Sequence, residues 1–203
     1  MFQCLLHSLD DPVKINFGEP GRNEQPGYQQ IGIKNSGFPD GGTFESDFNC
    51  WSTSCSISIK GWVLTRNTHP EMTNEWANIS NILRSSFFGD GKLPINVSIS
   101  GLDANTYYEV KTYHHSSYYN GNQGGAFTLQ YAGNEAHSLE QSSSKTSPDP
   151  PLIHTETVRT TDQGTIEFNM KMTRGPYMNL NGMEISPGRF YVWLVCLFSD
   201  FLL

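Results

Sequence analysis

The densest group of side chains that could bind a ligand lies between residues 113 and 122. Its members are aromatic, imidazole and amide residues: Tyr113, His114, His115, Tyr118, Tyr119, Asn120 and Asn122. Aromatic rings stack on the C–H faces of sugars, and imidazole and amide groups hydrogen-bond to hydroxyls. The segment leaves a predicted strand and enters a glycine-containing loop, where binding residues are often placed. We therefore predict a ligand site here; the alternative is a tyrosine-rich loop that packs only against itself.

Alternation along the strand divides this group between two faces. Tyr113 and His115 point one way and His114 the other, so one of the two histidines is expected to face the core. Because adjacent strand residues do not face one ion together, no zinc site is expected from the histidine pair. Trp62 is a further candidate for the ligand-binding surface, although a tryptophan on a strand more often belongs to the core.

Four cysteines are present: Cys4, Cys50, Cys55 and Cys196. Cys50 and Cys55 lie close together in a Ser/Thr-rich segment, and we predict a disulfide between them. The alternative is a pair of partly buried thiols. No CxxC motif occurs, so a zinc ribbon or a thioredoxin-type centre has no support.

Motifs of catalysis are absent from the sequence. It contains no Gly-x-Ser-x-Gly elbow, no HExxH and no phosphate-binding loop. A carboxylate pair for glycoside hydrolysis remains open, because acids such as Glu109 and Glu167 could meet across neighbouring strands. Nothing in the sequence distinguishes these two from ordinary acids on a strand surface.

The composition is polar but weakly charged. The 203 residues carry a net charge of −7, and only 16% are charged, against about 25% in an average domain. Scarce Lys and Arg argue against nucleic-acid binding. The abundant Ser, Thr, Asn, Gly and aromatic residues favour an extracellular all-β protein. No signal peptide is visible at the start of the sequence, and two N-glycosylation sequons begin at Asn78 and Asn96.

Apolar periodicity predicts about eight strands and one helix in a single domain over residues 13–186. The predicted strands are 13–17, 57–64, 93–100, 107–115, 125–132, 152–159, 165–171 and 180–185. The helix is predicted over 73–87, and residues 134–151 as a surface loop. Residues 1–12 form an N-terminal extension. Residues 187–203 form an apolar C-terminal extension: a membrane anchor, a non-native segment or a core strand.

Several segments, in order, resemble the carbohydrate-binding β-sandwiches of the galactose-binding-like, malectin-like group. The matching segments are Ile15-Asn16-Phe17-Gly18, Pro26-Gly27-Tyr28, Ile82-Leu83-Arg84, Gly101-Leu102, Thr106-Tyr107-Tyr108-Glu109-Val110, Tyr113-His114-His115 and Leu180-Asn181-Gly182-Met183-Glu184-Ile185. The resemblance implies an antiparallel β-sandwich of the jelly-roll type with one short helix, whose last strand pairs beside the first. The acidic, tryptophan-containing segment that malectin has soon after the first strand is not clearly present.

Related sandwiches often carry a structural calcium near the first and last strands, bound by carboxylates and carbonyls. Glu19 and Glu184 occupy suitable positions for such an ion, and no other cofactor is expected. The leading hypothesis is a non-catalytic, secreted or surface module that binds a neutral glycan through the Tyr/His/Asn loop. A structural or adhesive sandwich for protein contacts and a β-sandwich glycan hydrolase are the alternatives.

Overall fold

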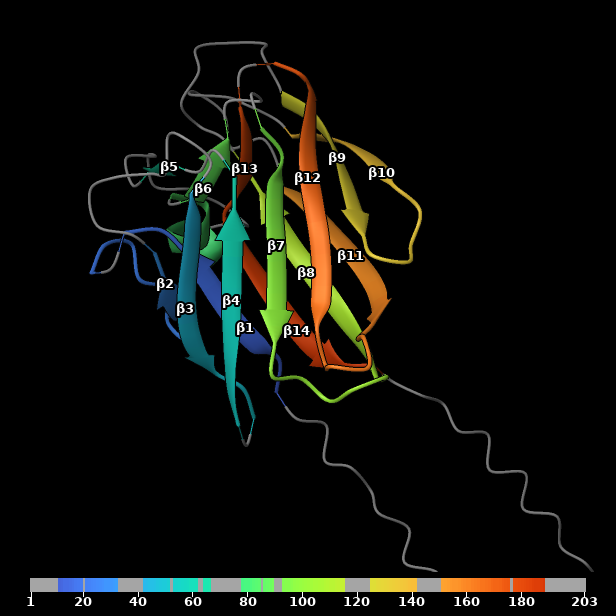
Figure 1. Cartoon of the computed structure of the whole chain (residues 1–203). Helices are drawn as coiled ribbons and strands as arrows, with labels where there is room; N and C mark the ends of the chain where they lie inside the picture. Colours follow the sequence, from blue (N-terminus) through green and yellow to red (C-terminus); the bar gives the residue numbers. More distant parts are fainter. Residues whose placement is uncertain are drawn as a thin grey trace, which may run out of the picture.

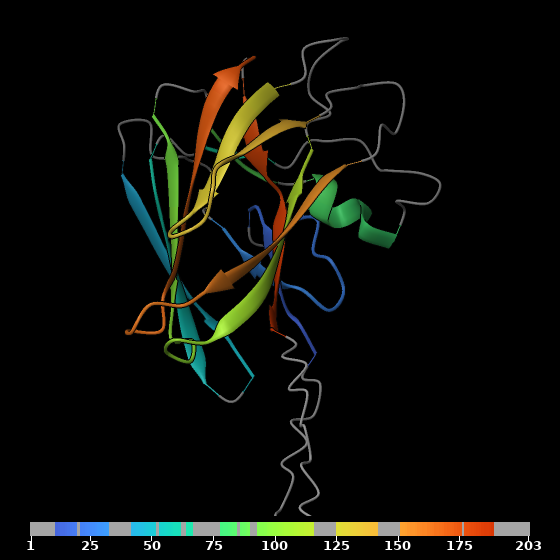
Figure 2. The same cartoon turned by 90° about the vertical axis from the view of Figure 1, so that its right-hand side faces the viewer.

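The structure is a computed structural model. It describes residues 11–19, 21–32, 42–51, 53–61, 64–66, 78–84, 86–89, 93–115, 125–141, 151–175 and 177–188. Within these ranges the chain is almost entirely β-structure, arranged as two large sheets packed face to face with a small third sheet and one short helix (Figures 1 and 2). The predicted all-β sandwich is therefore confirmed.

The first large sheet has five strands. In spatial order they are β11 (Leu152–Arg159), β8 (Tyr107–His114), β14 (Gly182–Pro187), β1 (Val13–Phe17) and β2 (Gln29–Ile31). As the resemblance implied, the first strand β1 pairs with the last strand β14, antiparallel, with Ile15 opposite Met183. β2 adds to the far side of β1 in parallel. The sheet thus joins the two ends of the described chain.

The second large sheet has six strands, all antiparallel. In spatial order they are β10 (His137–Gln141), β9 (Gly125–Tyr131), β12 (Ile166–Arg174), β7 (Ile95–Ser100), β4 (Ser54–Lys60) and β3 (Thr43–Asn49). Apolar and polar residues alternate along the central strands, so one face packs on the core and the other faces outward. In β4, for example, Ile57 and Ile59 are fully buried while Ser58 between them is only half-buried.

The main core fills the space between the two sheets. Its largest fully buried side chains include Phe17, Ile57, Ile99, Phe127 and Tyr131. Their strands come from both sheets, so the alternating pattern of each strand is satisfied only when the two layers close on each other.

The third sheet and the helix lie at one end of the sandwich. The sheet contains β13 (Met178–Leu180), β6 (Ser86–Gly89) and β5 (Leu64–Arg66), and the helix is α1 (Ser80–Arg84). The helix predicted over 73–87 is therefore wrong at its C-terminal end. Phe87 lies in β6, fully buried against Phe17 with ring centroids 5.2 Å apart. Burial of that ring in the main core takes precedence over its helical spacing. Residues 71–77 lie outside the described residues.

Two local features hold the strand connections. Cys50 and Cys55, beside the turn that joins β3 to β4, form the disulfide that the sequence predicted. In the turn before β12, Gly164 has a φ of +70°, and a Cβ there would lie 2.0 Å from the Leu102 carbonyl oxygen. Only glycine fits this turn, which brings β12 in beside β7.

The predicted loop 134–151 is wrong in its first part, because β10 occupies His137–Gln141 and pairs with β9. The last strand β14 runs to Pro187, one residue past the predicted end of the domain. Of the predicted extensions, residues 1–10 and 189–203 lie outside the described residues. In the part that the structure describes, no helix combines the length and apolar composition needed to cross a bilayer.

Candidate functional site

Tyr113, a predicted ligand-binding residue, points outward from the five-stranded sheet but is covered. Helix α1 lies against that end of the sheet (Figure 2), and its Ile82 and Leu83 form a separate small core with Tyr113. The tyrosine is 4% exposed, and its hydroxyl donates a hydrogen bond to Glu184 Oε1 at 2.6 Å. The helix therefore turns a surface aromatic into a buried one.

The two histidines that follow are also buried. His114 faces the main core, its ring centroid 4.9 Å from that of Phe127. Its Nδ1 lies 2.6 Å from the Asn179 carbonyl oxygen. Burial lowers the pKa of His114 to about 4, so the ring is neutral at physiological pH. His115 is 1% exposed, and its backbone N–H donates to Asn181 Oδ1 at 2.7 Å. The expectation that one of the two histidines faces the core is therefore confirmed for His114, and His115 is buried as well.

Tyr113 and His115 thus do not line an open groove. The remaining residues of the predicted ligand-binding set lie outside the described residues: Trp62, Tyr118, Tyr119, Asn120 and Asn122. Their role as a binding loop stays a prediction.

Glu184 lies at the centre of a polar cluster on the covered face. Its carboxylate accepts hydrogen bonds from the hydroxyls of Tyr28 and Tyr113, and Lys111 Nζ lies 3.1 Å from Oε2. Burial raises the pKa of the Glu184 carboxyl, but the hydrogen bonds from both tyrosines and Lys111 outweigh it, and the net pKa is lowered. Burial and the neighbouring Glu184 raise the pKa of both tyrosines, which stay protonated as donors. This cluster joins β14, β8 and the segment before β2.

The calcium site predicted from Glu19 and Glu184 stays a prediction, and the two carboxylates have different partners in the structure. Glu184 is held by the tyrosines and Lys111, whereas Glu19 pairs with Arg22 at 3.5 Å. Neither belongs to the cluster of three potential metal ligands in the described part of the chain, which lies at the edge strands β10 and β11.

The acids considered for glycoside hydrolysis do not form a pair. Glu109 is exposed on β8 of the five-stranded sheet, and Glu167 is exposed on β12 of the six-stranded sheet. Each points away from the core, so they lie on opposite outer faces of the sandwich. A reaction that needs two carboxylates flanking one glycosidic bond has no support from this pair.

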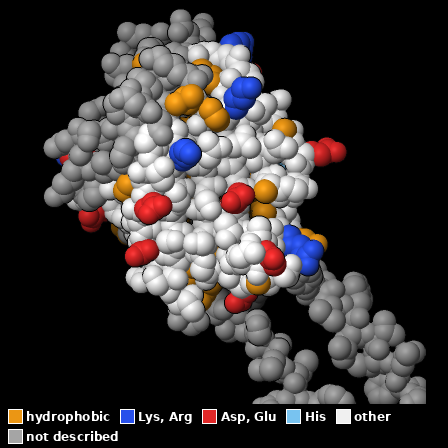
Figure 3. All heavy atoms as spheres, in the orientation of Figure 1, with side chains coloured by type: hydrophobic (Ala, Val, Ile, Leu, Met, Phe, Trp, Pro, Cys, Tyr) orange, Lys and Arg blue, Asp and Glu red, His pale blue; other side chains and the backbone are white. Residues whose placement is uncertain are grey.

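Among the described residues, the outer face of the six-stranded sheet carries a hollow of about 510 Å³ that opens to solvent. Figure 3 views this face and shows a surface that is mostly uncharged, with scattered acidic and basic side chains. The side chains that point into the hollow are mainly amides and hydroxyls, from β4, β7, β9 and β12: Ser58, Lys60, Asn96, Ser98, Gln130, Glu167 and Asn169. None of them was singled out as a ligand-binding residue from the sequence.

Strand pairing aligns these side chains in two rows across the sheet. The first row runs through Lys60, Asn96, Asn169 and Gln130, which are direct partners on β4, β7, β12 and β9. In the second row, Ser98 pairs with Ser58 on one side and Glu167 on the other. Each strand contributes its outward residues at a spacing of about 4.8 Å from the next strand. Alternating polar residues on four predicted strands, 57–64, 93–100, 125–132 and 165–171, were the sequence signal for this face.

The sequence matches no protein-family model, and it matches no curated protein. Solved structures do resemble it. The ectodomain of ANX2 from Arabidopsis thaliana, a plant receptor-like kinase, has 11% identity and a TM-score of 0.54, covering 88% of this chain and 50% of that one. The ANXUR2 extracellular domain from the same plant has 13% identity and a TM-score of 0.51, covering 88% and 49%.

A bacterial structure is equally similar. A beta-glucuronidase from Bacteroides uniformis has 13% identity and a TM-score of 0.55, covering 88% of this chain and 18% of that one. The chain therefore spans about half the length of the plant ectodomains and less than a fifth of the glucuronidase. At these identities the likeness shows the fold alone, a β-sandwich consistent with the malectin-like group that the sequence resembles.

Proposed function

We propose that this chain is a non-catalytic domain of a secreted or surface protein that binds a neutral glycan on the open face of the six-stranded sheet. The observation that carries the proposal is the hollow itself: about 510 Å³, lined by amide and hydroxyl side chains held in register on four adjacent strands. A rigid sheet fixes such groups before the ligand arrives, which lowers the entropy cost of binding.

The chemistry of the lining matches that of sugar hydroxyls. Each amide of Asn96, Asn169 and Gln130 can both donate and accept hydrogen bonds, as can the hydroxyls of Ser58 and Ser98. A hydroxyl group has the same double capacity, so neighbouring hydroxyls on a sugar ring find complementary partners. The first row crosses three strand spacings, about 14 Å, which suits an oligosaccharide better than a single sugar.

The charged and apolar side chains near the hollow also favour a neutral glycan over a charged ligand or a protein partner. The lining contains one cation, Lys60, and one carboxylate, Glu167, so it has no net preference for a charged ligand. Among the described residues the exposed large hydrophobics are Leu93, Tyr107 and Ile153, and none of them lines the hollow. The described residues therefore place no exposed large hydrophobic side chain at the hollow, whereas the adhesive alternative requires an apolar docking patch.

The comparisons add support at the level of the fold. One similar structure is part of a beta-glucuronidase and others are ectodomains of a plant receptor-like kinase. A domain of this kind, attached to a larger enzyme or receptor, fits the small share of those chains that it covers. The loop predicted around Tyr118, Tyr119, Asn120 and Asn122, together with Trp62, lies outside the described residues and stays a second predicted site for the same function.

A glycan array followed by calorimetry with the best ligand tests the proposal. Protein made in bacteria is used, because Asn96 belongs to a sequon and lies in the hollow. Asn96→Ala and Asn169→Ala are each expected to weaken binding about tenfold, since each removes hydrogen bonds worth about 1.4 kcal/mol. Thr155→Ala, an exposed change on the other sheet, is the matched control and leaves affinity unchanged.

The loop variant Tyr118→Ala/Tyr119→Ala distinguishes the two surfaces. If it abolishes binding while Asn96→Ala and Asn169→Ala keep full affinity, the ligand binds the loop and the assignment to the sheet is wrong. If folded wild-type protein binds no glycan on the array, the proposed function itself is overturned.

A further inference from the structure

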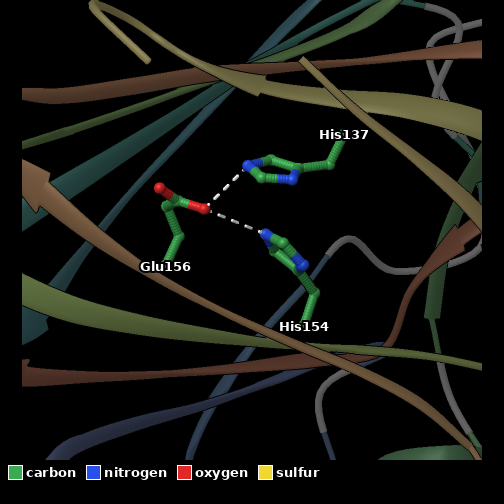
Figure 4. A group of neighbouring side chains, drawn as sticks. All are labelled: His137, His154 and Glu156. Atoms are coloured by element: carbon green, nitrogen blue, oxygen red, sulfur yellow. Dashed lines mark ion pairs between the residues drawn. The ribbon is translucent and has the colours of Figure 1, made fainter. Parts of the chain in front are cut away.

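The two sheets meet at one edge of the sandwich through the strands β10 and β11. β10 is the edge strand of the six-stranded sheet and β11 that of the five-stranded sheet. Three potential metal ligands lie there: His137 on β10, and His154 and Glu156 on β11 (Figure 4). We propose that these three side chains bind a divalent transition-metal ion, with Zn²⁺ as the representative, and so link the two sheets.

Strand alternation explains why the three side chains converge. His154 and Glu156 are two residues apart and point to the same side of β11, while Thr155 between them is exposed. On β10, His137 points inward and the next residue, Ser138, is exposed. Because the inner faces of the two sheets oppose each other, the three groups are brought together from strands that are not hydrogen-bonded to one another.

The distances suit a metal site. Glu156 Oε2 lies 2.8 Å from His137 Nε2 and 3.5 Å from His154 Nε2, and all three ligand atoms lie within 4.8 Å of one another. In a tetrahedral zinc site with bonds of about 2.0–2.1 Å, neighbouring ligand atoms are about 3.3–3.4 Å apart. The distances from Glu156 Oε2, 2.8 and 3.5 Å, lie on either side of that spacing.

The state of His154 supports a ligand role. Its Nε2 atom is buried and points into the cluster, as Figure 4 shows, and its contact with Glu156 Oε2 is a 3.5 Å ion pair that falls short of hydrogen-bond geometry. A buried imidazole nitrogen without a hydrogen bond loses solvation that a bound metal ion restores. Two neutral imidazoles and one carboxylate form a set of three protein ligands that is typical of zinc sites which leave a fourth position open.

A neighbouring side chain orients the carboxylate. Asn134 Nδ2 donates to Glu156 Oε1 at 2.7 Å and to the Thr157 carbonyl oxygen at 3.1 Å. This contact holds Oε1 away from the cluster and presents Oε2 to the two histidines. Outer hydrogen bonds of this kind fix ligand geometry in metal sites.

The cluster is also accessible. The side chain of His137 is 38% exposed, whereas those of His154 and Glu156 are 12% and 19% exposed. Solvent therefore reaches the site from the His137 side, where a water molecule can complete the coordination. The ordinary alternative is a histidine–glutamate ion pair without any metal, and the test must separate the two.

Calorimetric titration of the purified, untagged full chain with ZnCl₂ distinguishes a zinc site from a metal-free ion pair. We expect one ion per chain and a rise in Tm of roughly 5–10 °C at a free zinc concentration about 100 times Kd. His137→Ala, the most exposed of the three, should weaken zinc binding by at least about 100-fold, as should Glu156→Gln. Asn134→Ala should weaken it by about tenfold. Glu140→Gln, an exposed acid on β10, is the matched control and keeps wild-type affinity.

Cobalt provides a measurement that does not depend on the stability of the variants. Co²⁺ bound by the wild-type chain should give the visible bands of four-coordinate nitrogen and oxygen ligation, and Zn²⁺ should displace it stoichiometrically. If folded wild-type protein takes up neither ion, or if His137→Ala and Glu156→Gln bind zinc as tightly as wild type, the cluster is an ion pair only. Circular dichroism of each variant confirms that the fold is retained.

Discussion

The two outer faces of the sandwich are built by the same strand alternation, but one is covered by other parts of the chain and the other is exposed. On the five-stranded sheet, the outward Tyr113 and Glu184 are covered by α1 and by Tyr28, and they form a small core with its own ionic cluster. On the six-stranded sheet, the outward Asn96 and Asn169 line a hollow. One face has become structural, while the other keeps its polar groups available.

The difference teaches where recognition can occur in such a fold. A face that is covered by a helix gains stability from aromatic side chains, because they lose contact with water. Side chains on an open face contribute little to the stability of the fold, so they can instead bind a ligand. The aromatic cluster that a sequence highlights is for this reason not always the binding surface.

The largest expected difference between the faces concerns the helix. Leu83→Ala removes a fully buried side chain that packs with Tyr113 and Ile82, and we expect a loss of about 3 kcal/mol in the free energy of unfolding. The same change at Leu93, which is 42% exposed, should cost less than about 0.5 kcal/mol. Urea denaturation measures both. Equal losses would mean that α1 does not stabilise the covered face.

The next difference concerns single acids on the two faces. Glu184→Gln removes a carboxylate that accepts from two tyrosine hydroxyls and contacts Lys111, and it should cost about 2 kcal/mol. Glu167→Gln, an exposed change on the open face, should stay within about 0.5 kcal/mol. Urea denaturation at pH 7 compares the pair, and similar values for both would contradict the contrast.

The effect of Glu184 should also depend on pH in a defined direction. Its pKa is lowered in the folded state below the ordinary 4.5, so the folded chain binds its proton more weakly than the unfolded chain. The stabilisation is complete above pH 4.5 and is lost as pH falls through the folded-state pKa. The stability gap between wild type and Glu184→Gln should therefore narrow towards zero below pH 4.5. A gap that stays constant down to pH 3 would contradict this assignment.

Ligand mapping should separate the faces directly. When a glycan identified on the array is titrated into isotopically labelled protein, the side-chain amide signals of Asn96, Asn169 and Gln130 should shift. The backbone signals of Tyr113 and Lys111 should not. Nuclear magnetic resonance measures these shifts, and movement confined to the covered face would exclude the hollow as the binding surface.

The smallest effect is expected from an ion pair on the open face. Arg174 and Glu140 contact each other, but their side chains are 65% and 64% exposed. Solvent screens such pairs, so Arg174→Ala should change the free energy of unfolding by less than about 0.5 kcal/mol. A loss in the free energy of unfolding as large as that of Glu184→Gln would show that side chains on the open face also stabilise the fold.

Much of the sandwich was predictable because its central strands carry strict alternation. β1 and β11 match the predicted residues 13–17 and 152–159. The missed strands are mostly short or at edges, such as β2, β5 and β13, where few apolar residues mark a period. β6 was assigned to a helix because Phe87 has helical spacing to Leu83, and only the packing of Phe87 on Phe17 decides otherwise.

The site was less predictable, since its key residues are ordinary ones. Asn96 and Asn169 are 73 positions apart in the sequence and become partners only through the pairing of β7 with β12. His137 meets His154 and Glu156 only because two edge strands of different sheets lie side by side. Neither grouping leaves a local motif.

The sequence by itself determined the fold class and the weakly charged composition, and it favoured the pairing of Cys50 with Cys55. These depend on local alternation, short spacing and composition, which need no long-range information. The tertiary structure decided which side chains remain available. Helix α1 buries Tyr113, whereas the sheet that holds Asn96 and Asn169 has no such cover in the part of the chain that the structure describes. Exposure depends on what packs above a residue, and that is set by contacts distant in sequence.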